Sequence, residues 1–208
     1  MLTTSVEAFE RLRRLQVTFA SVCNSIAPVV SEQRCWNRVA LHHLVYRRMR
    51  EEFPELGSQM VCNAIYAVCK VARIVYQHPK SPFHYKEINK LPQLKFMDTS
   101  PVFFDWHTLS LGDGKLSIFT LDGRMKFPMT LSQMQRDIVD SQKLVEIAFQ
   151  THPENLLTLT FKFRLIDVNE ANTQEESVSW PLLPKETYVL LPQMLQEIEK
   201  YESTTNAK

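Results

Sequence analysis

The sequence predicts an α+β protein in which a three-helix bundle precedes a small antiparallel β-barrel and a short C-terminal helix. Before residue 79, apolar residues recur every three or four positions, as they do on amphipathic helices. After Pro101, short runs with a period of two are separated by turn signals at Gly112-Asp113-Gly114 and Asp122-Gly123, as they are in β-hairpins. The 208 residues are 44% apolar and 23% charged, which is typical of a folded globular protein.

Three helices are predicted in the first part of the chain. The first begins at Val6, continues to Ile26 and ends near Pro28, because proline lacks the amide that a helix interior needs. The second begins at Ser31, a typical N-cap residue, and continues to Phe53. The third covers residues 58–78. Short links between these segments favour a bundle.

A proline-rich and aromatic segment follows the third helix over residues 79–101. It has no helical period, so we expect a mostly extended connection that marks a domain boundary. The predicted domains are a helical domain over residues 1–93, a β-barrel domain over residues 94–168 and an acidic C-terminal part over residues 169–208.

The second part of the chain alternates like β-structure. Strands are expected at residues 102–106, 107–111, 115–121, 124–129, 143–150 and 156–165, with a short polar helix at 131–142. Short strands at this spacing are typical of a small barrel or sandwich. Residues 191–202 are expected to form the closing helix.

The charge is divided unevenly along the chain. Residues 1–97 contain 14 Lys/Arg and 7 Asp/Glu, a net charge of +7, whereas residues 98–208 contain 10 and 16, a net charge of −6. The non-apolar face of the second predicted helix is expected to be strongly basic, with Arg34, Arg38, Arg47, Arg48 and Arg50 all on it. Arginine suits phosphate, so this pattern favours a polyanion as partner; the alternative is a solvated face that pairs with Glu51, Glu52 and Glu55.

No motif predicts an active site. Phosphate-binding, dinucleotide-binding and common hydrolase patterns are missing from the sequence. The four cysteines are separated by 12, 27 and 7 positions, which matches no zinc template, so we expect reduced, buried thiols. Adjacent His42 and His43 point about a hundred degrees apart on a helix and make no joint metal site. We assign no catalytic residue, metal or cofactor.

Membrane and secretory classes are not predicted. No apolar run approaches the roughly 20 residues that cross a bilayer. Arg11, Arg13 and Arg14 stand where a signal peptide would be apolar. We therefore expect a cytoplasmic protein without membrane contact.

Two segments together resemble a known family. Residues 37–72 and 104–129 are similar to the helical portion and the wedge-domain strands of TnpB-like (OrfB) proteins, the transposon-encoded RNA-guided nucleases related to type V CRISPR effectors. The residues that carry the match in the first segment are Tyr46, Arg50, Gln59, Asn63, Ala64 and Ile65. In the second they are Leu109, Ser110, Thr120, Leu121, Gly123, Arg124, Lys126 and Pro128.

The resemblance covers only the recognition and wedge half. The family's RuvC nuclease has a first catalytic aspartate in a glycine-containing context, but residues 166–181 contain no glycine. Asp167 alone cannot build a two-metal site, which needs several converging carboxylates. The family's zinc-binding cysteine pairs are missing too, and the first wedge strand is expected to be absent, leaving the barrel open or completed by a partner.

The resemblance therefore implies a nuclease-dead protein that binds structured, guide-type RNA, with double-stranded DNA as a further ligand. Its recognition-type bundle and OB-like wedge barrel would carry the site. The residues expected to bind nucleic acid are Arg11, Arg13, Arg14, Arg34, Arg38, Arg47, Arg48, Arg50, Lys70, Arg73, Arg124 and Lys126. For Arg124 and Lys126, the alternative is charge that protects a strand edge.

Two other functions fit the sequence. The chain could be a protein-interaction subunit that docks through acidic residues 167–202 and completes or regulates a larger RNA-guided or transposase complex. It could also be a degenerate transposase fragment with no selected activity. Co-elution with a second polypeptide favours the former, and unstable or aggregated protein favours the latter.

Overall fold

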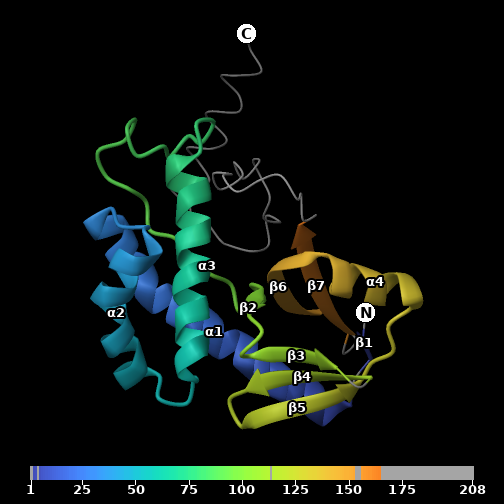
Figure 1. Cartoon of the computed structure of the whole chain (residues 1–208). Helices are drawn as coiled ribbons and strands as arrows, with labels where there is room; N and C mark the ends of the chain where they lie inside the picture. Colours follow the sequence, from blue (N-terminus) through green and yellow to red (C-terminus); the bar gives the residue numbers. More distant parts are fainter. Residues whose placement is uncertain (1, 4, 113, 153–155, 165–208) are drawn as a thin grey trace.

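The computed structural model describes residues 2–3, 5–112, 114–152 and 156–164 (Figure 1). The described chain is α+β, as predicted. Its elements, in order, are β1 (Leu2–Thr3), α1 (Val6–Gln33), α2 (Arg38–Glu52), α3 (Ser58–Gln77), β2 (Val102–Phe104), β3 (Leu109–Gly112), β4 (Lys115–Thr120), β5 (Gly123–Pro128), α4 (Gln133–Ser141), β6 (Lys143–His152) and β7 (Leu156–Arg164).

Helix α1 is longer than the sequence predicts. It begins at the N-cap Ser5, whose side chain accepts a hydrogen bond from the Ala8 amide, and it continues through Pro28 to Gln33. The expected end near Pro28 is therefore wrong. Val30 is fully buried beyond the proline, so packing against the core holds the helix where its local sequence favours an end.

Arg34 ends α1 in the left-handed backbone conformation, with φ 49° and ψ 39°. It is the only non-glycine residue with positive φ in the described part of the chain. Its guanidinium donates hydrogen bonds to the carbonyl oxygens of Tyr85, Ile88 and Asn89, at 3.3, 3.2 and 2.5 Å. These three bonds offset the unfavourable backbone conformation. The prediction that Arg34 belongs to the second helix is wrong.

The second helix begins seven residues later than Ser31, at Arg38. Its N-cap is Asn37, whose side-chain oxygen accepts hydrogen bonds from the amides of Val39 and Ala40, at 3.0 and 3.1 Å. Ser31 does not cap it, because its hydroxyl donates to the Pro28 carbonyl inside α1 at 3.0 Å. The third predicted helix is confirmed as α3.

Residues 79–101 form an irregular connection, as the lack of a helical period predicts. It is nevertheless firmly attached to the helices. Asn24 of α1 makes two hydrogen bonds to the backbone of Phe96, at 2.9 and 2.7 Å, and the Tyr76 hydroxyl donates to the Pro92 carbonyl. Phe83 and Leu94 are buried in the core.

The strands form two separate antiparallel sheets within the described residues. One has the order β1-β7-β6-β2 and the other the order β3-β4-β5. The predicted small barrel is therefore not found, because within the described residues the two sheets do not close into one. The edge strands β1 and β2 contain only two and three residues, which is too short for a continuous hydrogen-bonded ring. The polar helix expected at 131–142 is confirmed as α4.

An N-terminal strand was not expected, yet β1 is present. Leu2 and Thr3 pair with Leu157 and Leu156 of β7. This short strand covers only the beginning of β7. In the four-stranded sheet, the first described residues of the chain therefore pair with the last described strand, β7.

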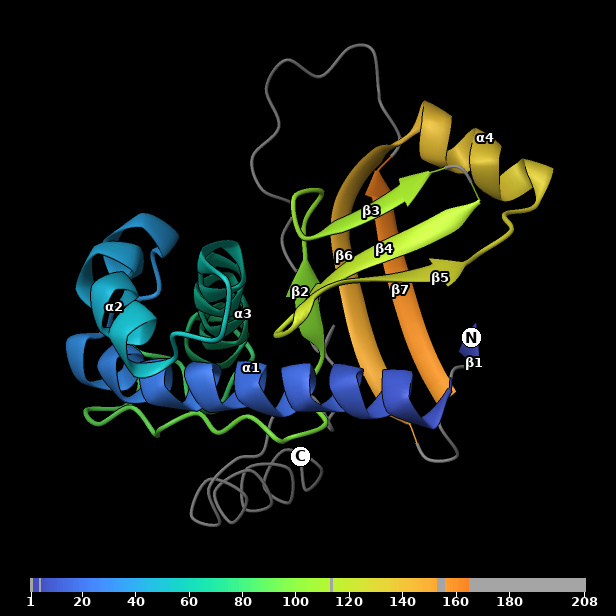
Figure 2. The same cartoon turned by 90° about the horizontal axis from the view of Figure 1, so that it is seen from below.

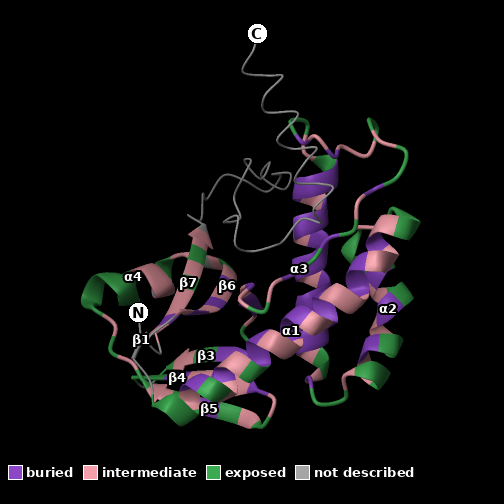
Figure 3. Cartoon of the chain, turned by 180° about the vertical axis from the view of Figure 1, so that it is seen from behind, coloured by how far each residue is buried: buried purple, intermediate pink, exposed green. Residues whose placement is uncertain are grey.

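Helix α1 connects the helical and β regions. It contacts α2 and α3 at one end and β2, β4 and β6 at the other, and Figure 2 shows it crossing the molecule beneath both regions. Buried Gln16 donates a hydrogen bond to the Ser100 carbonyl at 2.9 Å and accepts one from Thr151 of β6. One apolar core includes residues from the helices and from both sheets (Figure 3). The domain boundary near residue 93 stays a prediction.

Residues 165–208 lie outside the described part, so the expected C-terminal helix and the acidic residues 167–202 are not described. Among the described residues, no helix has both the length and the apolar character needed to cross a membrane.

Candidate nucleic-acid interface

The arginines of α2 do not share one face. Arg38 and Arg47 are nine residues apart, about two and a half helical turns, and so lie on opposite sides of the helix. The Arg38 guanidinium carbon lies 5.6 Å from the centre of the Tyr66 ring on α3. Arg47 forms an exposed ion pair with Glu51 at 3.0 Å. For Arg47, the structure thus shows the alternative prediction, a solvated residue that pairs with a glutamate of the same helix.

Arg48 and Arg50 have neutral partners instead. Arg48 donates a hydrogen bond to the Ser25 carbonyl of α1 at 2.8 Å, and Arg50 donates to the Leu56 carbonyl in the α2-α3 turn. A carbonyl orients a guanidinium without neutralising its charge. Each arginine also has five N–H donors, so further donors are available for a ligand.

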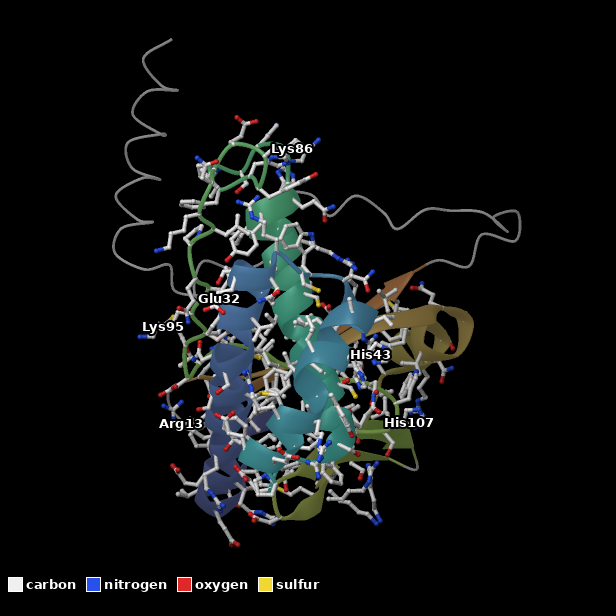
Figure 4. All side chains as sticks on the ribbon, turned by 90° about the vertical axis from the view of Figure 1, so that its left-hand side faces the viewer. Arg13, Glu32, His43, Lys86, Lys95 and His107 are labelled. Atoms are coloured by element: carbon white, nitrogen blue, oxygen red, sulfur yellow. The ribbon has the colours of Figure 1, made fainter. Side chains whose placement is uncertain are left out.

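The three predicted cations of α1 lie at its N-terminal end. Arg11 and Arg14 both approach the Asp122 carboxylate in the β4-β5 turn, at 3.7 and 3.4 Å. Arg13 lies at the opposite edge of the molecule from His107 (Figure 4). These arginines are therefore separated from the cations near α2, and two of them are paired with a carboxylate.

The cations of α3 face the four-stranded sheet. The Lys70 ammonium lies 2.5 Å from a Glu146 oxygen on β6, and the Tyr66 hydroxyl donates to the same oxygen at 2.8 Å. Lys70 also lies 4.9 Å from the centre of the Phe103 ring. Burial, and then the charge of Glu146, raise the pKa of Tyr66 well above its ordinary value. Arg73, one turn beyond Lys70, is half-buried.

Arg124 and Lys126 are exposed on β5, which is an edge strand of the three-stranded sheet. Arg124 donates hydrogen bonds to the Ser117 hydroxyl at 3.3 Å and to the His107 carbonyl at 2.5 Å. Its partners are again neutral. Because β5 is an edge strand, the two charges can equally well serve to prevent pairing with a strand of another molecule.

Sequence reasoning missed Trp106 as a candidate ligand-binding residue. Among the described Phe, Tyr and Trp residues it is the most exposed, with 48% of its surface accessible. It lies in the turn between β2 and β3. Trp36, in contrast, packs against Tyr76 and Tyr85, with ring centres 5.8 and 5.6 Å apart. The strand predicted over residues 102–106 is too long, because β2 ends at Phe104 and Trp106 follows in the turn.

The described residues give no sign of a metal centre. No cluster of three or more His, Cys, Asp or Glu side chains could hold a metal ion there. The rings of His42 and His43 are perpendicular, with centres 5.9 Å apart, and His42 stacks on Tyr46. All four cysteines are free thiols; Cys23 and Cys69 are buried, whereas Cys35 and Cys62 are partly exposed.

Comparison with known proteins does not assign the chain to a family. No protein-family model matches the sequence, and a search of curated proteins found no significant match.

Proposed function

We propose that this protein binds nucleic acid and belongs to the recognition and wedge half of the TnpB-like family. Its ligand is structured, guide-type RNA, with double-stranded DNA as a further ligand, and it carries no nuclease activity of its own. The support comes from the resemblance of residues 37–72 and 104–129 and from how the arginines are held.

The observation that carries the proposal is that several arginines are oriented by neutral groups. Carbonyl oxygens hold Arg34, Arg48 and Arg50, the Tyr66 ring faces Arg38, and a carbonyl with a hydroxyl holds Arg124. Such contacts fix a guanidinium and leave its positive charge in place. A phosphate backbone then meets oriented charges, and binding releases the counterions of the nucleic acid.

This proposal is tested by comparing two pairs of arginines. The double variant Arg38→Gln/Arg48→Gln removes two charges with neutral partners, whereas Arg11→Gln/Arg14→Gln removes two that face Asp122. We expect the first to weaken RNA binding and to reduce the salt slope of log K by about 1.5 to 2. The control should weaken binding less, because Asp122 balances one of its two positive charges. Affinity independent of salt, or equal losses in both variants, would contradict the proposal.

A second experiment identifies the ligand. The tagged protein is purified from its own host at moderate salt, and any nucleic acid that accompanies it is sequenced. One discrete small RNA would support the guide-type ligand. Cleavage of that RNA or of matching DNA by the purified protein with Mg²⁺ would contradict the absence of nuclease activity.

The alternative of a protein-interaction subunit depends on residues 167–202, which lie outside the described residues. Folded protein that carries no nucleic acid and elutes with a second polypeptide would favour it. Aggregated or unstable protein would favour a degenerate transposase fragment.

A further inference from the structure

The three-stranded sheet has one apolar face and one basic face. Leu109, Leu116 and Ile118 are buried on the inner face. Because side chains alternate along a strand, the register places Ser110, Ser117 and Lys126 in one row on the opposite face. Lys115 and Arg124 lie on the same side, and the outer sheet face is defined by these five residues: Ser110, Lys115, Ser117, Arg124 and Lys126.

Trp106 lies in the β2-β3 turn, which is held by several hydrogen bonds. One Asp105 carboxylate oxygen accepts hydrogen bonds from the His107 amide, at 3.1 Å, and from the Thr108 amide and hydroxyl, at 3.0 and 2.8 Å. The other oxygen accepts from the Gln59 amide group of α3 at 2.5 Å. Trp106 therefore lies between residues that are held by hydrogen bonds, and about half of its surface is exposed. The turn is already ordered before a ligand binds.

Arg124 joins the turn to the sheet. It donates to the carbonyl of His107, the residue next to Trp106, so the backbone of this turn lies within one side-chain length of the outer sheet face. In Figure 4, His107 lies at the opposite edge of the molecule from Arg13 and Lys95. At the far end of β4, the α2-α3 turn covers Phe119, since a Cβ on Gly57 would lie 2.7 Å from that ring.

The charge of this surface is positive. Among the described residues of the turn and of β3, β4 and β5, Asp105 is the only carboxylate, and it faces Gln59 rather than solvent. Asp122, in the next turn, is directed toward Arg11 and Arg14 of α1. Lys115, Arg124 and Lys126 have no described carboxylate within ion-pair distance.

An exposed aromatic ring beside cations and hydroxyl groups suits unpaired nucleotides. A base that is free of a duplex can stack on an indole, and its phosphates can meet the cations. Bases inside a duplex are already stacked and cannot reach the ring. The Ser110 and Ser117 hydroxyls can exchange hydrogen bonds with a ribose 2′-hydroxyl, which DNA lacks.

We infer that Trp106 and the outer sheet face form a site for single-stranded RNA, with one base stacked on the indole. This inference rests on the proposed function and names the part of the ligand that reaches this surface. This inference concerns residues other than Arg38 and Arg48, which test the proposed function. The inference and the proposed function can therefore fail separately.

The test measures binding of a dye-labelled single-stranded RNA and of a duplex RNA of equal length by fluorescence anisotropy. Trp106→Ala should weaken single-strand binding about tenfold and leave duplex binding within about twofold, because stacking acts only on unpaired bases. Trp106→Phe should retain most of the affinity. Met134→Ala is the matched control, since it removes another exposed apolar side chain, on α4.

A second variant tests the cations without changing the turn. Lys115→Gln/Lys126→Gln should weaken single-strand binding and lower its salt slope by about 1.4, whereas Lys95→Gln, on the opposite side of the molecule, should have no effect. Wild-type protein that binds duplex RNA and not the single strand would overturn this inference alone, as would unchanged binding in both site variants. Equal affinity for single-stranded DNA would overturn the choice of RNA. No binding to any RNA would overturn the proposed function itself.

Discussion

Helices α2 and α3 are neighbours of similar length, but they meet their surroundings in different ways. α3 buries 13 of its 20 residues, whereas α2 buries only Leu41, Val45 and Met49 among its 15. Figure 3 shows α3 largely buried and α2 exposed along its outer side. Burial on most sides therefore fixes α3, while one buried stripe, a cap and a few side-chain contacts fix α2. Surface chemistry can change on α2 with little cost to the fold.

The largest expected difference concerns apolar truncation. Ile65→Ala on α3, where the side chain is 1% exposed, should lower the free energy of unfolding by about 3 kcal/mol through lost burial and a cavity. Leu44→Ala on α2, where the side chain is 56% exposed, should lower it by less than about 0.5 kcal/mol. Urea unfolding measures both. Similar losses would show that α2 is fixed by burial after all.

The two ion pairs provide the next comparison. Glu146→Gln leaves Lys70 in a site where the two side chains are only 14% and 18% exposed, so we expect a loss of about 2 kcal/mol. Glu51→Gln breaks the exposed pair with Arg47, where the loss should be below about 0.5 kcal/mol. Adding 1 M salt should reduce the second effect further. If Glu146→Gln left the free energy of unfolding unchanged, Lys70 would have to find another partner.

A smaller effect is expected at the helix N-termini. Asn37→Ala removes the two cap hydrogen bonds of α2 and should cost about 1 kcal/mol. The N-cap of α3 is Gly57, which has no side-chain hydrogen bond to lose, so Ser58→Ala beside it should change stability by less than about 0.5 kcal/mol. Circular dichroism during urea unfolding gives the comparison. Equal effects would contradict a special role of the cap in α2.

The smallest effect at neutral pH concerns Cys69 on α3. Burial raises the pKa of its thiol from 9.0 to about 11, while nearby Arg73 acts in the opposite direction. The folded state thus keeps the thiol proton longer than the unfolded state does. This contribution to stability is complete below pH 9 and is lost as the pH rises from 9 to 11. Unfolding free energies of the wild type should therefore fall more steeply over this window than those of Cys69→Ala.

The sequence predicts most elements because their patterns are local. The apolar spacing of residues 58–77 and the alternation around Asp122-Gly123 depend on neighbours within a few positions, so α3 and the β4-β5 hairpin are found where they are expected. Pro28 and Ser31 were misleading for the same reason. Their local preferences favour a helix end and a helix start, but burial of Val30 overrides both.

The candidate site was harder to predict. Choosing arginines by type identified Arg38 and Arg124, but only the fold shows that Arg11 and Arg14 face Asp122 while Arg34 closes α1. Trp106 was overlooked because the alternation of residues 102–106 predicted a strand that includes it. Its exposure follows from a turn that depends on Gln59, a residue 46 positions earlier in the chain.

Periodicity and charge among neighbouring residues were enough to predict the α+β class, the order of the elements other than β1, and the basic character of the N-terminal half. Only long-range contacts set the division into two sheets that do not close, which arginines face a carboxylate, and the place of Trp106 in a turn. These features depend on contacts between segments far apart in the chain, and no local pattern records which distant group a side chain will meet.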